Sequence, residues 1–259
     1  MDNVKYVNHL GETLNLRSAE IMSSYEALKS FVMSMSNNRL TSEGKTTALP
    51  VVCLSIDAAN KLINTLEKDS INNKHGKLYI NDWYIKVIYQ GLSPIMRTSD
   101  KVKFELSFYA EDTIFTKETS YQLSATSTIS GSGLNFPFNF PFNLGADPIA
   151  SVAVTNNELL DADFVLKFDK PTSDISISID TNSYIIDAAI NEGETFVLDT
   201  AEKEVYKLTQ YGKTSLLGAA DDTSYIFNPI SNGQHKIIWS GDFPLFLTLL
   251  EHRRTPIWI

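Results

Sequence analysis

The sequence predicts a mainly β protein of two domains: a β-rich N-terminal domain with one helix, and an all-β sandwich that follows a linker. Three observations predict this class. Short β-branched and aromatic runs dominate the chain, one segment has a sustained helical spacing of apolar residues, and a Ser/Thr/Gly-rich stretch divides the sequence near its middle. We place the domains at residues 1–128 and 136–259, with the linker at 129–135.

The N-terminal domain begins with strand-like runs. VKYVN at residues 4–8 and ETLNL at 12–16 flank a turn candidate, HLG at 9–11. The segment 18–28 spaces apolar residues along one helical face, which predicts a short helix. The alternating letters of FVMSMS at 31–36 predict a further strand.

A buried strand and the main helix come next. ALPVVCLSI at 48–56 is apolar and β-branched, which is typical of a buried strand, and we expect the single cysteine, Cys53, to pack inside it. The following residues carry apolar side chains at helical spacing and predict a helix near 57–69, with Asp57 as its N-cap.

An aromatic hairpin follows the helix. KLYINDWYIKVIYQ at 77–90 is two apolar runs around an Asn-Asp turn, and KVKFELSFYAED at 101–112 alternates as a strand does. The hairpin aromatics suit either the core of a protein interface or the core of the domain itself. Both alternatives stay open, and the candidate packing or interface residues here are Trp83 and Tyr84.

The C-terminal part repeats short strands about 8–12 residues apart, a rhythm typical of an antiparallel sandwich. The expected strands are SVAVTN, ADFVLKF, DISISID, SYIIDAA, ETFVLDT, EVYKLT, HKIIWSG and PLFLTLLEH. Turn signals such as NEG at 191–193 and SNG at 231–233 separate them.

The segment FPFNFPFN at residues 136–143 is extended, because its prolines exclude a helix. Side chains of an extended chain alternate, so its four phenylalanines fall on one face. Burying each is worth roughly 1.5–3 kcal/mol, so this chain or a partner subunit must cover them. We expect them to dock on the sandwich while the prolines keep the outer edge from recruiting another strand. The residues are Phe136, Phe138, Phe140 and Phe142.

Charge divides unevenly along the chain. Residues 1–130 carry 14 basic and 14 acidic residues, whereas residues 131–259 carry 8 and 17 and hold the whole net charge of −9. Phosphate contacts need clustered Lys and Arg, so we expect no specific nucleic-acid binding. The N-terminal MDNVKYVNHL does not read as a signal peptide, and no run of about 20 apolar residues predicts a membrane span. We expect synthesis in a cytoplasm.

No motif indicates an enzyme. The sequence contains no G-x-S-x-G, no phosphate-binding G-x-x-x-x-G-K-[ST] and no G-x-G-x-x-G. The aspartates at 161–163 and 221–222 lack the later residues of a calcium loop. The histidines have no zinc-ligand spacing and suit surface or turn positions; they are His9, His75, His235 and His252. We expect no catalytic site, no metal and no cofactor.

The order of these segments resembles the distal tail protein family of phages. The hairpin GKLYINDWYIKV followed by KFELSFYAED is similar to that family's N-terminal domain. GLNFPFNFPFNLG is similar to the segment that opens its second domain, and FNPISNGQHKIIWSG looks like its closing hairpin. The resemblance covers nearly the whole chain, through structural motifs that are individually of moderate specificity.

This resemblance implies a virion structural protein at the tail tip. It implies a β-barrel-like N-terminal domain that forms a homohexameric ring, and a galectin-like C-terminal sandwich that projects outward. The implied partners are further copies of the chain, the tail tube protein, and tail-associated or receptor-binding proteins. The implied location is the virion tail tip, after synthesis in the cytoplasm of a host bacterium.

Two other classes of function stay open. A carbohydrate-binding sandwich of a tail or cell-surface adhesion device needs an aromatic platform with polar neighbours, and the candidates are Trp239 with His235, or Trp258 near the arginines at 253–254. Core packing is the alternative for Trp239. A wall-degrading hydrolase lacks a recognisable site. The terminal residues 257–259 either pack within their domain or dock into a neighbour.

Overall fold

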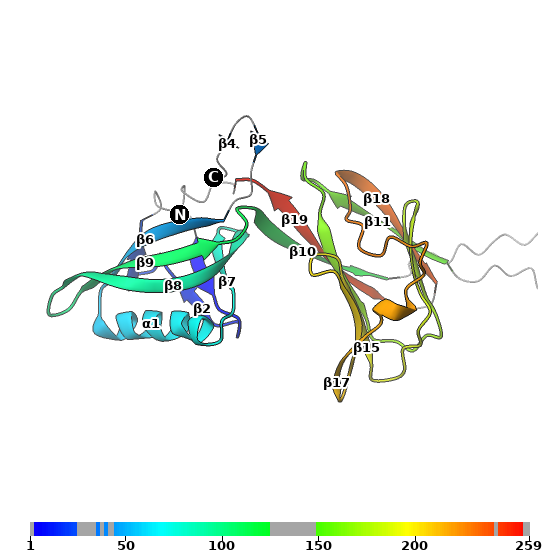
Figure 1. Ribbon diagram of the computed structural model, residues 1–259, viewed down its shortest axis with the longest axis horizontal. Coiled ribbons are helices and arrows are strands. Elements are labelled where there is room, and N and C mark those ends of the chain that lie inside the picture. The colour runs from blue at the N-terminus through cyan, green and yellow to red at the C-terminus, as the bar shows by residue number, and fades with distance from the viewer. Residues whose placement is uncertain are drawn as a thin grey trace, which may run out of the picture. The chain divides into compact units, whose positions relative to one another are not determined.

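The structure is a computed structural model that describes residues 3–24, 35–36, 39–40, 44–124, 149–240 and 243–255. The chain forms two compact units (Figure 1): unit 1 is Met1–Lys117 with Arg253–Ile259, and unit 2 is Glu118–His252. Unit 2 is therefore inserted in the sequence of unit 1, whereas the sequence pattern predicts a second domain at residues 136–259. The expected linker, the FPFNFPFN segment and residues 257–259 lie outside the described residues.

Unit 1 is built from strands and one helix. The strands are β1 (Val4–Val7), β2 (Thr13–Asn15), β3 (Ile21–Ser23), β4 (Met35–Ser36), β5 (Arg39–Leu40), β6 (Lys45–Cys53), β7 (Gly76–Ile80), β8 (Trp83–Arg97) and β9 (Val102–Ala110). Strand β10 (Phe115–Leu123) leads from unit 1 into unit 2. The short β4 and β5 pair only with each other among the described strands.

The long strand β8 belongs to two antiparallel strand sets. Its first part pairs with β7 in the order β8-β7-β1-β2, and its second part pairs with β9 in the order β8-β9-β6-β3. The pairing slips between Tyr89 and Gly91, and Gly91 has φ 143°. Such a bulge bends a strand and increases its twist, which lets β8 serve both sets.

The turn between β7 and β8 confirms the hairpin expected from the Asn-Asp pair. Asn81 has φ 56°, a conformation that asparagine adopts more readily than most residues. Its side chain also accepts a hydrogen bond from the backbone N–H of Asn3 at 2.9 Å. The HLG turn is likewise present, and Gly11 takes φ 81°.

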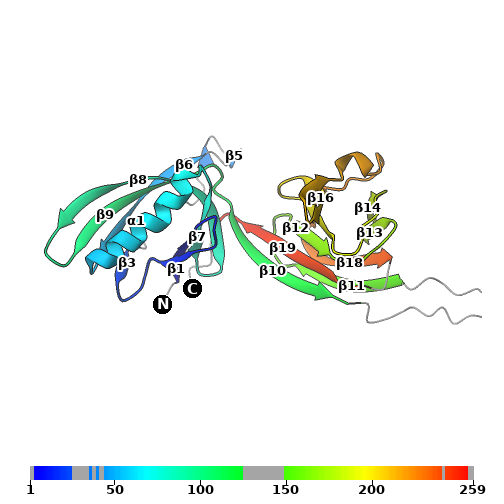
Figure 2. The same ribbon diagram turned by 90° about the horizontal axis from the view of Figure 1, so that it is seen from below.

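The helix α1 extends from Ile56 to Ile71 and packs against β8 and β6 (Figure 2). Its N-cap is Ser55, so the expectation of Asp57 was wrong. Ser55 has extended backbone angles (φ −151°, ψ 159°), and its hydroxyl accepts a hydrogen bond from the Ala58 N–H at 3.1 Å. Asp57 lies in the first turn instead, where a negative charge stabilises the helix dipole.

The helix expected over 18–28 is also wrong where the structure describes it, because Ile21–Ser23 is strand β3 and pairs with β6. Residues 25–34 lie outside the described part. Ile21 is one of the apolar residues whose spacing suggested a helix. In the structure it is a residue of β3, is 4% exposed and packs in the core of unit 1. Pairing with a long neighbouring strand overrides so weak a helical pattern.

Unit 2 contains β11 (Ile149–Asn156), β12 (Asp163–Phe168), β13 (Ile175–Ile179), β14 (Asn182–Ile186), β15 (Thr195–Asp199), β16 (Glu204–Thr209), β17 (Gly212–Ser215), a 3-10 helix (η2, Leu217–Ala219), β18 (Gly233–Ser240) and β19 (Leu245–Arg253). Every strand expected in this part of the sequence is present. Strand β17 was not predicted, because its four residues are all exposed and include no apolar side chain.

Two antiparallel sheets make unit 2 a sandwich. One has the order β17-β16-β15-β12-β19-β10 and the other β11-β18-β13-β14. Large side chains from both sheets form one core, for example Phe164 against Tyr184 with ring centroids 5.6 Å apart. Each such ring removes a large apolar area from water. The described residues therefore confirm the mainly β class, with α1 as the one α-helix they contain.

Candidate binding and assembly surfaces

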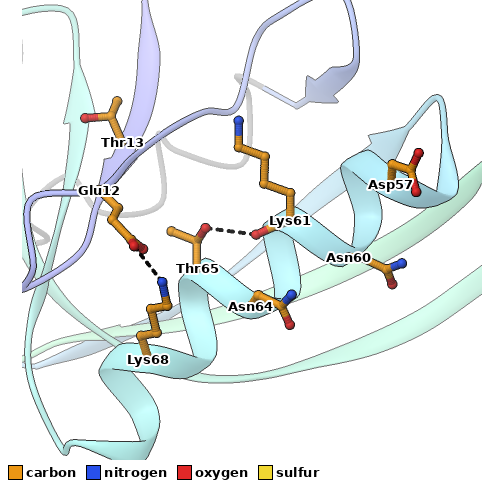
Figure 3. Close-up of a pocket in the computed structure, with 8 residues that line it drawn as sticks. All are labelled: Glu12, Thr13, Asp57, Asn60, Lys61, Asn64, Thr65 and Lys68. Atoms are coloured by element: carbon orange, nitrogen blue, oxygen red, sulfur yellow. Dashed lines mark hydrogen bonds and ion pairs between the residues drawn. The ribbon is translucent and has the colours of Figure 1, made fainter.

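An open polar groove of about 590 Å³ runs along one side of α1 in unit 1 (Figure 3). The helix contributes Asp57, Asn60, Lys61, Asn64, Thr65 and Lys68, and the chain leading into β2 contributes Glu12 and Thr13. These helical positions recur every three or four residues, so they form one polar stripe that borders the buried face, and Thr65 is itself buried.

An ion pair crosses this groove. Lys68 donates to Glu12 Oε1 at 2.5 Å, and the Asn8 amide donates to Glu12 Oε2 at 2.9 Å. The Lys68 ammonium, and then the Asn8 amide, lower the pKa of Glu12 from its ordinary value. Because Lys68 and Glu12 are each close to half exposed, water screens the pair and it contributes little to stability. The groove carries hydrogen-bonding groups without an aromatic platform, so it does not suit sugar stacking.

A buried cluster near the C-terminal end of α1 connects the helix to β1 and to the turn that follows β1. The Asp69 carboxylate of α1 is 0% exposed and accepts hydrogen bonds from the Tyr6 hydroxyl of β1 and from the backbone N–H of His9 at 2.9 Å. The ring nitrogen Nδ1 of His9 contacts the same oxygen as its backbone N–H. Burial, and then the hydrogen bond to Asp69, raise the pKa of Tyr6 above its ordinary value. This cluster fixes the end of α1 on the β1–β2 turn.

The structure places the hairpin aromatics Trp83 and Tyr84 inside unit 1. Trp83 is 3% exposed, and the Arg253 guanidinium lies 4.5 Å from its ring centroid. Tyr84 is 4% exposed, with Lys77 Nζ 4.4 Å from its ring. A cation over an aromatic face is attracted by the ring quadrupole. These contacts favour the packing role, and a role in an interface stays a prediction.

The sugar candidates of unit 2 both lie on β18. Trp239 is 1% exposed, and its indole N–H donates to the Phe243 carbonyl at 3.0 Å. His235 contacts Asp180 Oδ2 at 2.6 Å and the Ser231 carbonyl at 2.9 Å. The backbone N–H of Lys236, and then His235, lower the pKa of Asp180. The Trp239 ring therefore serves the core rather than offering a face to a sugar. Trp258 lies outside the described residues.

Each of the four histidines lies beside a carboxylate, a pattern that sequence spacing does not reveal. The partners are far apart in the chain, as for His252 Nε2 and Asp163 Oδ2, which are 3.1 Å apart. The hydrogen bond from His252 is the main cause that lowers the pKa of Asp163. His235 and His252 are strand residues whose side chains are partly exposed, at 11% and 18%.

The described residues include neither a group of metal-ligating side chains nor a helix suited to spanning a membrane. No cluster of three or more His, Cys, Asp or Glu side chains among them could hold a metal ion. Within the same part of the chain, no helix has the length and apolar character needed to span a membrane.

The expected docking of the phenylalanines at 136, 138, 140 and 142 falls outside the described residues and stays a prediction.

Comparisons with known proteins find similarity in structure and not in sequence. No family model matches the chain, and no curated protein matches it. The crystal structure of SPP1 Dit (gp 19.1), described as a paradigm of the hub adsorption apparatus in phages infecting Gram-positive bacteria, is similar with a TM-score of 0.50 and 10% identity, over 98% of this chain and 99% of that chain.

Chains of the phage P2 baseplate are also similar. In its activated conformation with Ca the TM-score is 0.61 at 11% identity, over 99% of this chain and 100% of that chain. In the same conformation with Sr the TM-score is 0.60 at 11% identity, with the same coverage. This chain therefore has the mainly β, Dit-like fold of phage hub and baseplate proteins.

Proposed function

We propose that this chain is a non-enzymatic structural protein of a phage tail tip, and that it assembles into a homohexameric ring, the distal tail hub. One observation carries the proposal: the similarity to hub and baseplate chains extends over at least 98% of this chain and of those chains. The fold of a single widespread domain occurs in proteins with many unrelated functions, so likeness in one domain indicates little about function. A likeness that includes two different β units, with one inserted in the sequence of the other, restricts the choice much further.

The ring would join the tail tube protein to tail-associated or receptor-binding proteins, at the tail tip of the virion. The charge of each unit supports a different role for each, with self-contact in unit 1 and contact with solvent or other proteins in unit 2. Unit 1 carries 16 Lys and Arg against 13 Asp and Glu, whereas unit 2 carries 6 against 18. Repeated contacts between nearly neutral units avoid self-repulsion, and a strongly acidic unit suits solvent or a basic partner.

The test is the mass of the purified chain in solution. Six chains of 29.0 kDa give about 174 kDa by light scattering, and negative-stain images of that species would show rings. A chain that stays at 29.0 kDa at every concentration, and also fails to form rings when mixed with tail tubes, would overturn the hub assignment. A glycan array run on the same sample then tests the carbohydrate-binding alternative.

A further inference from the structure

One end of the unit 2 sandwich holds a histidine between two hydrogen-bond acceptors. His235 lies near the start of β18, and its side chain is 11% exposed. Its ring nitrogen Nδ1 lies 2.6 Å from Asp180 Oδ2, and its other ring nitrogen, Nε2, lies 2.9 Å from the Ser231 carbonyl oxygen. Both ring nitrogens therefore face an oxygen at hydrogen-bonding distance.

Neither of these two oxygens can donate a hydrogen bond. A backbone carbonyl only accepts, and so does an ionised carboxylate. The hydrogen bond from the Lys236 backbone N–H, and then that from His235, lower the pKa of Asp180, so its carboxylate is ionised over the ordinary pH range. A neutral imidazole has one N–H and can serve one acceptor, whereas an imidazolium has two and can serve both. The geometry around the ring therefore fits the charged form of His235.

The Asp180 carboxylate is itself fixed in position. Asp180 lies in the turn between β13 and β14 with φ 51°, a conformation that aspartate adopts more readily than most residues. Its backbone N–H donates to the Lys236 carbonyl at 2.9 Å, and its Oδ1 accepts from the Lys236 backbone N–H at 2.7 Å. One carboxylate oxygen thus joins the β13–β14 turn to β18, and the other meets His235.

The elements around the ring add no competing charge. Among the described residues, Asp180 is the one ion-pair partner of His235. On β11, Val154 stands beside His235 in the strand register and is apolar and buried. On β14, the Tyr184 hydroxyl donates to a backbone carbonyl at 2.9 Å, and burial raises the pKa of Tyr184 to about 12, so it stays neutral. The Lys236 side chain points to the opposite face of β18, because successive strand residues alternate.

The same contacts extend to a further loop. Ser231 and Asn232 belong to the turn before β18, and the Asn232 amide donates to the Glu158 carbonyl at 2.8 Å. Glu158 lies in the loop between β11 and β12. A chain of hydrogen bonds therefore connects the β13–β14 turn, the turn at residues 231–233 and the β11–β12 loop, and the His235 ring is one of its members.

We propose that His235 is a pH-sensitive clasp of unit 2: its imidazolium form holds the β13–β14 turn and the turn at residues 231–233 together, and loss of the ring proton loosens them. Histidine is the side chain whose charge ordinarily changes between about pH 5 and 8. A neutral ring keeps one N–H, so either Asp180 or Ser231 loses its donor. The charge-assisted contact with Asp180 is lost at the same step.

The two partners respond to pH in opposite directions. A folded state that holds the His235 proton binds one proton more than an unfolded chain whose histidine is neutral, so this contribution to stability falls as the pH rises. The lowered pKa of Asp180 gives a contribution that is present above the ordinary carboxylate pKa and is lost as the pH falls through the lowered value. Both contributions are present between about pH 4 and 6, so the clasp is expected to be tightest there.

The first measurement is solid-state NMR of the full chain with nitrogen-15 in its histidine rings, which works for an assembly of any size. The nitrogen shifts report which ring nitrogens carry a proton, and substituting each of the four histidines in turn assigns the signals. We expect His235 to keep both ring protons at a pH at which His75 has lost one. His75 is the matched control, since its side chain is 44% exposed and its Nε2 lies 3.6 Å from Glu111 Oε1.

Hydrogen exchange measured by mass spectrometry then reports on the turns. The peptides that contain the amides of Asp180 and Lys236 are followed, and each rate is divided by the intrinsic rate at the same pH. In the wild type we expect their protection to fall about tenfold as the pH rises from about 5 to 8. His235→Gln keeps an amide donor without a titrating ring, and Asp180→Asn removes the charge with a residue that also adopts positive φ, so both should lose this pH dependence. His75→Gln should retain it.

The two measurements on the wild-type chain decide the matter even if a variant fails to fold. A His235 ring with a single protonated nitrogen wherever His75 is neutral overturns the clasp. A doubly protonated ring whose titration leaves the exchange of both turns unchanged overturns it as well. A doubly protonated ring, with turn protection that falls as the ring loses its proton, supports it.

Discussion

Replacing Asp69 with asparagine is expected to destabilise unit 1 strongly although the side chain keeps its size. The two carboxylate oxygens accept from the Tyr6 hydroxyl and from the His9 backbone N–H, in a place with no access to water. An amide offers only one oxygen, and its NH₂ group must face one of these donors. If the amide oxygen serves the His9 N–H, the NH₂ group faces the Tyr6 hydroxyl, which can rotate to accept from it but no longer donates to a charged acceptor.

The magnitude follows from the number of contacts changed. A hydrogen bond to a charged group contributes about 1.5–3 kcal/mol, and a buried polar group left unsatisfied costs about 1–3 kcal/mol. No donor need be orphaned in Asp69→Asn, so the loss of the charge-assisted contact alone gives about 1.5–3 kcal/mol. At about 2.1 cal/mol/K of unfolding entropy per residue, and about 120 residues in unit 1, each kcal/mol lowers Tm by about 4 °C. The expected decrease in Tm is therefore about 6–12 °C in the transition of unit 1.

The assay is urea unfolding and calorimetry of the full chain, in which unit 2 serves as an internal reference. Tyr6→Phe and the double variant complete a cycle, and residues in direct contact couple by about 0.5–3 kcal/mol. Asp57→Asn, an exposed acid in the same helix, is the matched control and should stay within about 0.5 kcal/mol. A change below about 1 kcal/mol in Asp69→Asn, or a coupling of zero with Tyr6, would refute the structural role of the cluster.

Three further predictions concern single elements. Ser55→Ala removes the N-cap of α1 and should cost about 1 kcal/mol in urea unfolding, whereas Ser70→Ala near the exposed end of the helix should cost less than half of that; equal losses would contradict the cap. Gly76→Ala places a methyl group onto the hydroxyl of Tyr6, which the buried cluster holds in place, and should lower the Tm of unit 1 by several degrees; an unchanged Tm would mean that Tyr6 can move. Burial raises the pKa of Tyr184 to about 12, so the unfolded state loses this proton first and the stability of unit 2 should fall by about 1.4 kcal/mol per pH unit above about pH 10; Tyr184→Phe should remove that part of the slope in urea unfolding at alkaline pH.

Strand patterns predicted most of unit 2 because its strands alternate and are separated by turn residues. β17 was missed, since Gly212–Ser215 is held by pairing with β16 and not by any buried side chain. The cap of α1 was misplaced by two residues, because both Ser55 and Asp57 have suitable side chains and only the backbone angles decide between them. Local patterns identify elements well and their ends poorly.

The polar clusters could not be predicted, because their members are distant in sequence. Tyr6 and Asp69 are 63 residues apart, and a tyrosine in an alternating strand gives no sign of a carboxylate partner on a helix.

The two structural units differ more in net charge than the two halves of the sequence do. Cutting the chain near its middle gives halves of 0 and −9, but assigning Glu118 to unit 2, and the arginines at 253 and 254 to unit 1, gives +3 and −12. At physiological salt a charge is screened beyond about 8 Å. In the proposed ring, copies of unit 2 that do not touch would therefore repel one another only weakly. Direct contact between two such acidic units would be repelled, so the self-association proposed above is better served by unit 1, whose net charge is small.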